Sequence, residues 1–274
     1  MRIAGRFLGP YSVNAIVWEG HQAGCRIERF IMNALESQVA VVTGAARGVG
    51  EAIARRLASM GAHVLLVARS AAKLNQVCEE IVEAGGAASV FHCDLMNASA
   101  VAQLGEAVAQ RHKRCDILIN NAGIGIDGKL LHEVTPDEWD LIFGTNLRGP
   151  YLMIRAFAPL MIAARSGHII NVSSLAGRNP LPRGAVYAAS KWGLNGLTCS
   201  VAEELRQYDI RVSAIAPGSI NTDFNDHSGR GVASGKDPKK KLQPDDIASV
   251  VATLVTQPPQ CFISEVLMRP TQKP

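Results

Sequence analysis

The sequence predicts an α/β protein: a doubly wound domain with a mostly or fully parallel sheet of about seven strands and helices on both faces. Short apolar runs alternate along the chain with longer stretches of helical period. The apolar runs contain no polar alternation, which is typical of strands buried on both faces. Glycine is frequent, at 25 of 274 residues, and aromatic residues make up only 5%, which suits tight turns around such a sheet. This is the pattern of a Rossmann-type domain.

The predicted elements follow one another from residue 38 onward. Apolar runs such as Val-Ala-Val-Val at 39–42 predict the strands, because a short apolar run between turn signals fits a buried strand. The predicted strands are residues 39–42, 63–67, 88–92, 117–119, 168–172, 211–215 and 263–268. The stretches between them carry apolar residues at helical spacing. The predicted helices are residues 51–60, 71–84, 99–112, 138–164, 187–207 and 244–256.

Glycine and proline mark irregularities in these helices. Gly85 and Gly86 form a stop signal after the second helix. The long stretch 138–164 contains Pro150 and Pro159, and proline removes a helical hydrogen bond, so we expect kinks near these two positions. Strands that alternate with helices imply parallel crossovers, so one domain accounts for nearly the whole chain.

The domain organisation follows from this pattern. In residues 1–36, glycines interrupt any periodicity and no apolar run is long enough for a signal peptide. We expect a nonfunctional N-terminal extension there; the alternative is a functional arm packed on the domain. Residues 37–274 are predicted to form a single Rossmann-type catalytic domain. Its glycine-containing segment at about 219–243 predicts a lid over the substrate.

Composition and charge exclude several classes of protein. With 47% hydrophobic and 19% charged residues, the chain has the balance of a packed domain. A net charge of +4 is too small to predict nucleic-acid binding without a clustered patch, and no apolar run approaches the roughly 18 residues that span a membrane. The six cysteines form no CxxC pair and have no metal-ligand spacing with histidine. They therefore predict free thiols in the cytoplasm and no metal site.

A glycine-rich turn, Thr43-Gly-Ala-Ala-Arg-Gly-Val-Gly50, follows the first strand and opens a helix. Glycines at such a turn let the backbone approach a pyrophosphate, and the helix N-terminus supplies amide donors. The second strand ends at Arg69, where NAD enzymes usually carry an acid. Arg47 lies in the turn, and two guanidiniums suit the 2′-phosphate of NADP. The alternative is that both arginines are solvated surface residues.

Tyr187 and Lys191 are four positions apart and therefore share one face of a helix. A phenol with a pKa near ~10 is a poor acid–base catalyst at neutral pH. A neighbouring ammonium favours the phenolate and lowers a phenol's pKa. Such a pair can give a proton to an alkoxide or take one from an alcohol. Alone, the spacing also fits a chance pair on a surface helix.

In their order along the chain, these residues and four further motifs resemble the short-chain dehydrogenase/reductase family. The resemblance covers about residues 38 to 268. The matching motifs are Thr43-Gly44-xxx-Gly48-x-Gly50, Asn120-Asn121-Ala122-Gly123, Asn146, Ser174, Tyr187-xxx-Lys191 and Pro217-Gly218-xxx-Thr222. The members that the pattern is most similar to are the 3-oxoacyl-thioester reductases and general carbonyl reductases.

The resemblance implies a set of cofactor contacts. Asp94 is expected at the adenine amino group, and Ile220 and Thr222 at the nicotinamide carboxamide; for Asp94 and Thr222 the alternative is a turn-capping side chain. Asn120 is expected to be structural, tying neighbouring strands. With Arg69, the expected cofactor-binding residues are Gly44, Ala46, Arg47, Val49, Asp94, Leu95, Asn121, Ala122, Gly123, Tyr187, Lys191, Pro217, Gly218, Ile220 and Thr222.

The resemblance also implies four catalytic residues for NADPH-dependent reduction of a carbonyl. Tyr187 is expected to donate the proton and Ser174 to orient the substrate oxygen, and the offset to Tyr187 favours Ser174 over Ser173. Lys191 is expected to tune Tyr187 and bind the ribose, and Asn146 to support a water relay. No metal is needed, because the hydroxyl groups polarise the carbonyl.

The sequence leaves several alternatives for the substrate class and for the oligomeric state. The expected substrate is a small carbonyl or alcohol. The alternatives to a carbonyl reductase are a hydroxysteroid or sugar alcohol dehydrogenase and a cofactor-sensing regulator without turnover. The long helix that holds Asn146 and the helix at 187–207 are apolar on more than one face, which predicts a homodimer or homotetramer. The residues that indicate this are Leu194, Leu197, Val201 and Leu205. His168 is expected to be structural.

Overall fold

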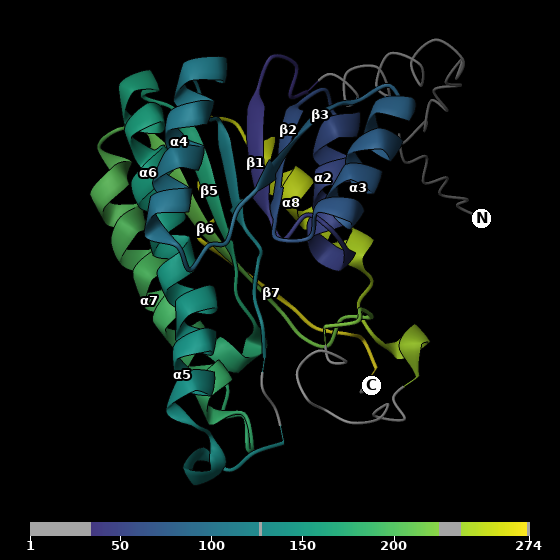
Figure 1. Cartoon of the computed structure of the whole chain (residues 1–274), viewed down its shortest axis with the longest axis vertical. Coiled ribbons are helices and arrows are strands. Elements are labelled where there is room, and N and C mark those ends of the chain that lie inside the picture. The colour runs from purple at the N-terminus through teal and green to yellow at the C-terminus, as the bar shows by residue number, and fades with distance from the viewer. Residues whose placement is uncertain (1–33, 126–127, 225–236, 273–274) are drawn as a thin grey trace, which may run out of the picture.

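The computed structural model describes residues 34–125, 128–224 and 237–272. These residues form one seven-stranded sheet whose strands all run parallel, in the order β3-β2-β1-β4-β5-β6-β7 (Figure 1). The predicted fold class is therefore confirmed. The strands are β1 (Val39–Thr43), β2 (His63–Ala68), β3 (Ala87–His92), β4 (Ile117–Asn120), β5 (Gly167–Val172), β6 (Ile210–Pro217) and β7 (Glu265–Met268).

Helices cover both faces of this sheet, as Figure 1 shows. One layer holds α2 (Gly48–Ser59), α3 (Ala71–Glu83) and α8 (Pro244–Val255). The other holds α4 (Ala98–His112), α6 (Gly149–Ala164) and α7 (Ala185–Arg206), with α5 (Pro136–Phe143) extending beyond the sheet. Short turns complete the described part: η1 (Leu131–Glu133), η2 (Gly144–Arg148), η3 (Leu175–Gly177) and η4 (Pro238–Lys240).

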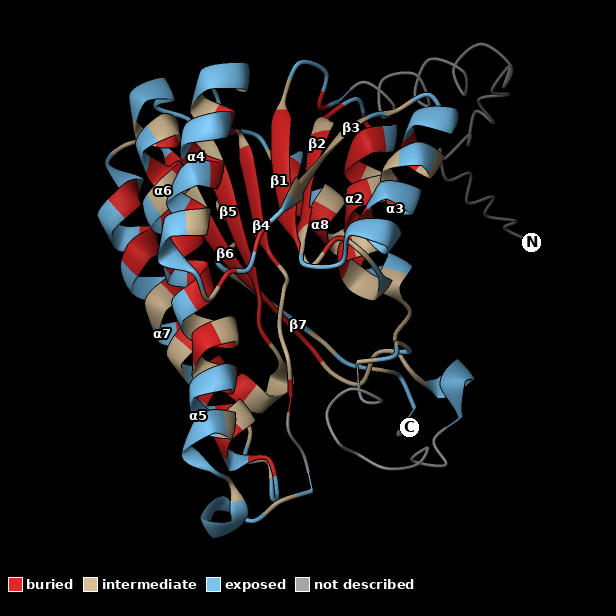
Figure 2. Cartoon of the chain, viewed as in Figure 1, coloured by how far each residue is buried: buried red, intermediate tan, exposed pale blue. Residues whose placement is uncertain are grey.

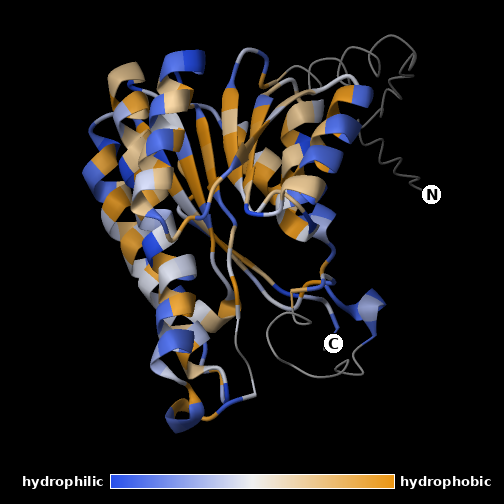
Figure 3. Cartoon of the chain, in the orientation of Figure 1, coloured by the Kyte–Doolittle hydropathy of each residue, from blue (hydrophilic) through white to orange (hydrophobic). Residues whose placement is uncertain are grey.

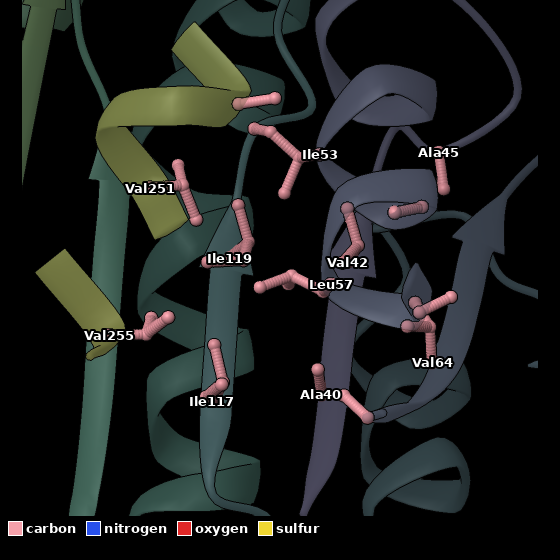
Figure 4. Packing of buried hydrophobic residues seen from close by; sticks show 14 of the residues in the cluster. Ala40, Val42, Ala45, Ile53, Leu57, Val64, Ile117, Ile119, Val251 and Val255 are labelled. Atoms are coloured by element: carbon pink, nitrogen blue, oxygen red, sulfur yellow. The ribbon is translucent and has the colours of Figure 1, made fainter. Parts of the chain in front are cut away.

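The core lies in two clusters, one on each side of the sheet, because the five inner strands are buried on both faces, whereas the edge strands β3 and β7 are only partly buried (Figure 2). In the first cluster, Val42 and Ile119 from the sheet face Leu57 of α2 and Val251 of α8 (Figure 4). Figure 3 shows the same division, with hydrophobic strands inside and polar residues on the outer faces of α3 and α4. Leu57 is fully buried, and its replacement by alanine should cost about 2–5 kcal/mol.

The long helix expected at 138–164 is interrupted directly before Gly149-Pro150, the first of the two predicted places. A π-helical turn, η2, separates α5 from α6, and the amide of Gly149 donates to the carbonyl of Gly144. Pro159 lies inside α6 without ending it. The break therefore falls on the turn that contains Asn146, and π-turns of this kind are frequent at functional sites.

The start of the domain is tied down by residues 34–38. Leu35 is buried in the first core cluster, and its amide donates to the carbonyl of Met60. Residues 1–33, and with them most of the expected extension, lie outside the described residues. So do residues 225–236 of the expected lid. The lid's flanks pair with each other, because Leu242 donates to Ser219 and accepts from Asn221.

Candidate active site

The predicted site residues converge at the carboxyl ends of the strands. The chain runs outward from β1 to β3 and then returns to β4 on the other side of β1. Ligands of doubly wound sheets bind in the crevice at such a switch point. The glycine turn follows β1, residues 121–123 follow β4, Ser174 follows β5, and Pro217 ends β6. Segments far apart in the sequence thus meet along one edge (Figure 1).

The glycine turn is held against the end of β4 by backbone contacts that leave no room for side chains. Gly44 has φ +67°, and a Cβ there would lie 2.9 Å from Asn121 Nδ2. A Cβ on Gly50 would lie 2.2 Å from the carbonyl oxygen of Gly44. Thr43 joins the two strands: its Oγ1 donates to the carbonyl of Ile119 and accepts from the amide of Asn121. The glycines are therefore needed for the turn to pack against the end of β4, and we call this turn, residues 43–50, the cradle.

Two exposed arginines flank this cradle. α2 begins at Gly48, and Arg47 occupies its N-cap position. Arg69 directly follows β2, which pairs with β1 up to the Thr43–Val67 register. Arg47 and Arg69 therefore follow two neighbouring strands at the same edge of the sheet. Ala46 and Val49 are partly buried against the first core cluster, so they shape the floor of the turn.

The side chains of Asp94 and Leu95, which follow β3, both make contacts within the chain. Asp94 is exposed, and its Oδ1 accepts a hydrogen bond from the amide of Met96, which is the turn-capping alternative. Leu95 is only 8% exposed and packs in the second core cluster, with its Cβ close to Gly149. Its side chain points into the core, so only its backbone is left to meet a cofactor.

Lys191 is buried beside Tyr187 on α7. Its Nζ lies 5.8 Å from the centroid of the Tyr187 ring and donates a 3.0 Å hydrogen bond to the carbonyl of Val172. The side chain is 3% exposed, and burial lowers the pKa of its ammonium to about 8. An ammonium has three donors, so two remain for other partners. Tyr187 itself is partly exposed.

Asn146 is fully buried in the π-turn, and its carboxamide is committed to the neighbouring loop. Its Nδ2 donates to the carbonyl of Ile124 (2.8 Å) and to Ser190 Oγ (3.0 Å), and its Oδ1 accepts from the Ile124 amide (2.9 Å). A Cβ on Gly123 would lie 3.3 Å from Asn146 Oδ1 and 3.5 Å from Lys191 Nζ. Asn146, Lys191 and the backbone of Gly123 thus form one packed group.

Exposure distinguishes the two candidate serines. Ser173 is buried, and its hydroxyl donates a long, 3.5 Å hydrogen bond to the carbonyl of Lys191. Ser174 is partly exposed at the start of η3, and its Oγ accepts from the amide of Ala176. A hydroxyl that accepts one bond keeps its proton to donate. Ser174 is therefore the serine that can meet a substrate.

The segment after β6 lies over the glycine turn. Pro217 is buried, and the amide of Gly218 donates to the carbonyl of Met268. Ile220 packs against the first core cluster. The methyl carbon of Thr222 would lie 3.4 Å from a Cβ on Gly48. This segment therefore lies against the cradle at Thr222 and Gly48.

Two residues expected to be structural have buried partners. Asn120 Nδ2 donates to Asn171 Oδ1 (2.8 Å), which ties β4 to β5 as expected. His168 Nε2 lies 2.8 Å from Ser213 Oγ, whose proton goes to the carbonyl of Ile263. Nε2 must then carry the ring proton. Burial, with help from Arg211, lowers the pKa of His168 to about 3.

Three contacts of the site were not among the predicted ones. Ser190, inside the Tyr187–Lys191 motif, accepts from Asn146 and donates to the carbonyl of Tyr187 (2.7 Å). Its position in the motif was the signal that could have found it. Thr43 is the first residue of the glycine turn and could have been found in the same way. The packing of Phe224 on Tyr187 has no local signal, because 37 positions separate the two residues.

The described residues contain neither a cluster of metal ligands nor a disulfide. Within them, no group of three histidine, cysteine or acidic side chains is placed to hold a metal ion. The five cysteines of this part of the chain form no disulfide with one another. None of its helices combines the length and the apolar character that crossing a bilayer requires.

Comparison with known proteins identifies the family. The model of the short chain dehydrogenase family matches residues 38–232, so the chain belongs to this family of oxidoreductases. The resemblance inferred from the motifs is thereby confirmed.

Particular relatives are similar over nearly the whole chain. A 3-oxoacyl-[acyl-carrier-protein] reductase of Synechocystis is 37% identical over 85% of this chain and 95% of its own. The crystal structure of a metagenomic short-chain oxidoreductase in complex with NADP is 54% identical, with a TM-score of 0.77, and covers 87% of this chain and all of its own. An alcohol dehydrogenase from the archaeon Thermococcus sibiricus, complexed with 5-hydroxy-NADP, is 31% identical, with a TM-score of 0.79, over 86% and 98%.

Proposed function

We propose that this protein reduces a carbonyl to an alcohol with NADPH, with Tyr187 as the proton donor. The observation that carries the proposal is the buried ammonium of Lys191, 5.8 Å from the ring of a partly exposed tyrosine. Burying a lysine costs free energy, because burial disfavours the charged form of its side chain. A buried lysine beside a partly exposed tyrosine therefore indicates a functional role. Here the positive charge favours the phenolate that Tyr187 becomes when it gives up its proton.

The cradle fits a dinucleotide. A side chain at Gly44 or Gly50 would collide with Asn121 or with the Gly44 carbonyl, so the glycines let the turn pack against the end of β4. This packing leaves the backbone amides at the start of α2 without large side chains beside them, as a pyrophosphate requires. We assign the pyrophosphate to the first turn of α2 and the adenosine ribose to Arg47 and Arg69. The two guanidiniums favour NADP over NAD. The solved relatives with bound NADP and 5-hydroxy-NADP support this choice.

The bound NADPH would supply the hydride, and the chain's own residues supply the rest. Ser174 donates a hydrogen bond to the substrate oxygen and orients it. Tyr187 donates the proton as negative charge develops on that oxygen. Lys191 has two donors beyond its bond to Val172, and these serve the ribose hydroxyls and the phenolate. In the reverse direction Tyr187 is the base.

Asn146 supports the return of the proton through its backbone. Its carboxamide nitrogen has spent both donors on Ile124 and Ser190. The extra residue of a π-turn releases a backbone carbonyl from the helical ladder. We therefore propose that the water that links Lys191 to solvent and returns the proton binds to a backbone carbonyl of η2. The side chain fixes the turn, and the backbone binds the water.

Two other functions remain as alternatives. A hydroxysteroid or sugar alcohol dehydrogenase would use the same four residues and differ only in the substrate pocket. A cofactor-sensing regulator would need no intact proton donor, and the presence of Ser174, Tyr187 and Lys191 disfavours it. The Synechocystis relative is a 3-oxoacyl-[acyl-carrier-protein] reductase, so 3-oxoacyl thioesters are included among the substrates to be tested.

We also propose a homodimer or homotetramer, on different residues from those first considered. Leu194, Val201 and Leu205 are buried within the chain, so their apolar character needs no second subunit. Tyr151 on α6 is 47% exposed and Trp192 on α7 is 49% exposed. Large exposed aromatic residues on adjacent helices are typical of an interface.

The proposal is tested by the loss of NADPH absorbance with a panel of 3-oxoacyl thioesters, diketones, aryl ketones, quinones and aldehydes. We expect turnover with at least one carbonyl class and a clear preference for NADPH over NADH. Tight NADPH binding without turnover of any compound would favour the regulator instead.

A further inference from the structure

Phe224 packs beside the reacting phenol. The centroids of the Phe224 and Tyr187 rings are 6.1 Å apart, and the ring planes are tilted by 58°. Tyr187 lies in the first turn of α7, whereas Phe224 lies in the segment that follows β6. Aromatic pairs in tilted arrangements at this separation are attractive. The contact therefore joins the substrate-side segment directly to the proposed proton donor.

Gly125 makes this contact possible. The residue is buried in the segment after β4, and a Cβ there would lie 3.2 Å from Phe224 Cε1 and 3.6 Å from Tyr187 Cδ2. The first distance is tighter than an ordinary van der Waals contact. A side chain at this position would move the Phe224 ring. The glycine is thus required for space.

The position of Phe224 is also set by the cradle. The Phe224 amide donates a 3.4 Å hydrogen bond to Thr222 Oγ1, and the methyl group of Thr222 lies over Gly48. The ring itself is only partly buried. Since the ring centroids are only 6.1 Å apart, a carbonyl substituent that extends along this side of Tyr187 would meet an apolar aromatic ring.

We propose that Phe224 is a specificity-determining residue: its ring, with the space left by Gly125, forms an aromatic wall that selects carbonyl substrates with a flat aromatic substituent. This inference rests on the proposed function and names the substrate class of the same site. The wall favours aryl ketones over saturated ketones of similar size. It acts on the substituent of the carbonyl, and the proton transfer from Tyr187 is unchanged.

The test compares acetophenone with cyclohexyl methyl ketone, which differ in the flatness of one substituent. In Phe224→Leu, an apolar side chain without a ring, we expect the ratio of kcat/KM for the two ketones to fall by ~3–10-fold through KM. Phe224→Tyr keeps the ring and should keep the ratio. Trp139→Leu removes an exposed ring stacked on Phe143 and should also leave it unchanged.

The outcomes separate this inference from the proposed function. Wild-type enzyme that reduces both ketones, with an unchanged ratio in Phe224→Leu, would overturn the aromatic wall and leave the reductase proposal intact. Wild-type enzyme that reduces neither ketone but does reduce another compound of the panel would also overturn the wall. If the wild-type enzyme reduces no carbonyl, both the aromatic wall and the reductase proposal are wrong. Gly125→Ala, which displaces the ring, should lower the same ratio as Phe224→Leu does.

Discussion

The ammonium of Lys191 is anchored by the carbonyl of Val172, two residues before Ser174. The 3.0 Å bond joins α7 to the end of β5, so the proposed proton donor and the substrate-orienting serine belong to elements that are tied together. Preorganised groups of this kind lower the cost of arranging the site during the reaction. The buried position has a consequence for binding, because it lowers the pKa of the lysine to about 8.

We expect NADPH affinity to depend on pH through this lysine. Below about pH 8 the ammonium is protonated, and the Kd should be constant. Above it, binding must reprotonate the lysine, so the Kd should rise by up to about 10-fold per pH unit. Fluorescence titration from pH 6.5 to 9.5 measures this. Lys191→Met should bind more weakly with no such dependence, and a flat wild-type profile would contradict the role.

The glycine turn can be tested by two opposite substitutions. Gly50→Ala places a methyl group 2.2 Å from the Gly44 carbonyl oxygen, so we expect a loss of about 1–3 kcal/mol in the free energy of unfolding and weaker NADPH binding. Gly196→Ala on α7 meets no atom of its own chain within 4 Å and should gain about 0.5–1 kcal/mol in the isolated subunit. Urea denaturation measures both. A neutral Gly50→Ala would show that the cradle is not tight.

The acid stability of the protein should depend on His168. Its pKa is lowered from 6.5 to about 3 in the folded state, so the unfolded chain binds a proton first as the pH falls. The contribution of His168 to the free energy of unfolding is fully present above pH 6.5. It is lost as the pH falls toward 3, by up to about 1.4 kcal/mol per pH unit. His168→Gln should flatten that loss between pH 6.5 and 4.5 in urea denaturation. The matched control, His132→Gln in exposed η1, should keep the wild-type slope; a wild-type slope in His168→Gln would refute the assignment.

The cofactor phosphate should be read by Arg69. Arg69→Asp replaces a guanidinium with an acid that repels a 2′-phosphate and can accept from a ribose hydroxyl. We expect the ratio of the Kd values for NADH and NADPH to fall by at least about 10-fold, since a single charge-assisted contact has that magnitude. Arg165→Asp changes the charge equally on the exposed end of α6 and should leave the ratio unchanged. An unchanged ratio in Arg69→Asp would remove Arg69 as the phosphate reader.

Most of the sheet could be predicted because its signal is local. The run at 39–42 is apolar without interruption, and β1 extends it by one residue. The π-turn at Asn146 could not be predicted, because the hydrogen bonds of the Asn146 side chain reach Ile124, 22 positions away. The orientation of Leu95 was missed for a related reason: a motif places a residue after a strand but does not say which way its side chain points. Phe224 was missed because its contact is made only in the folded chain.

The central claim is that Tyr187 donates the proton, and Tyr187→Phe tests it most directly. The substitution keeps the ring and its packing on Phe224 and removes only the hydroxyl group. With the best carbonyl substrate, we expect kcat to fall by about 100-fold or more, because general acid catalysis contributes that much. The Kd for NADPH and the melting temperature should stay close to the wild-type values. A purified Tyr187→Phe variant that binds NADPH and reduces the substrate at the wild-type rate would contradict the account.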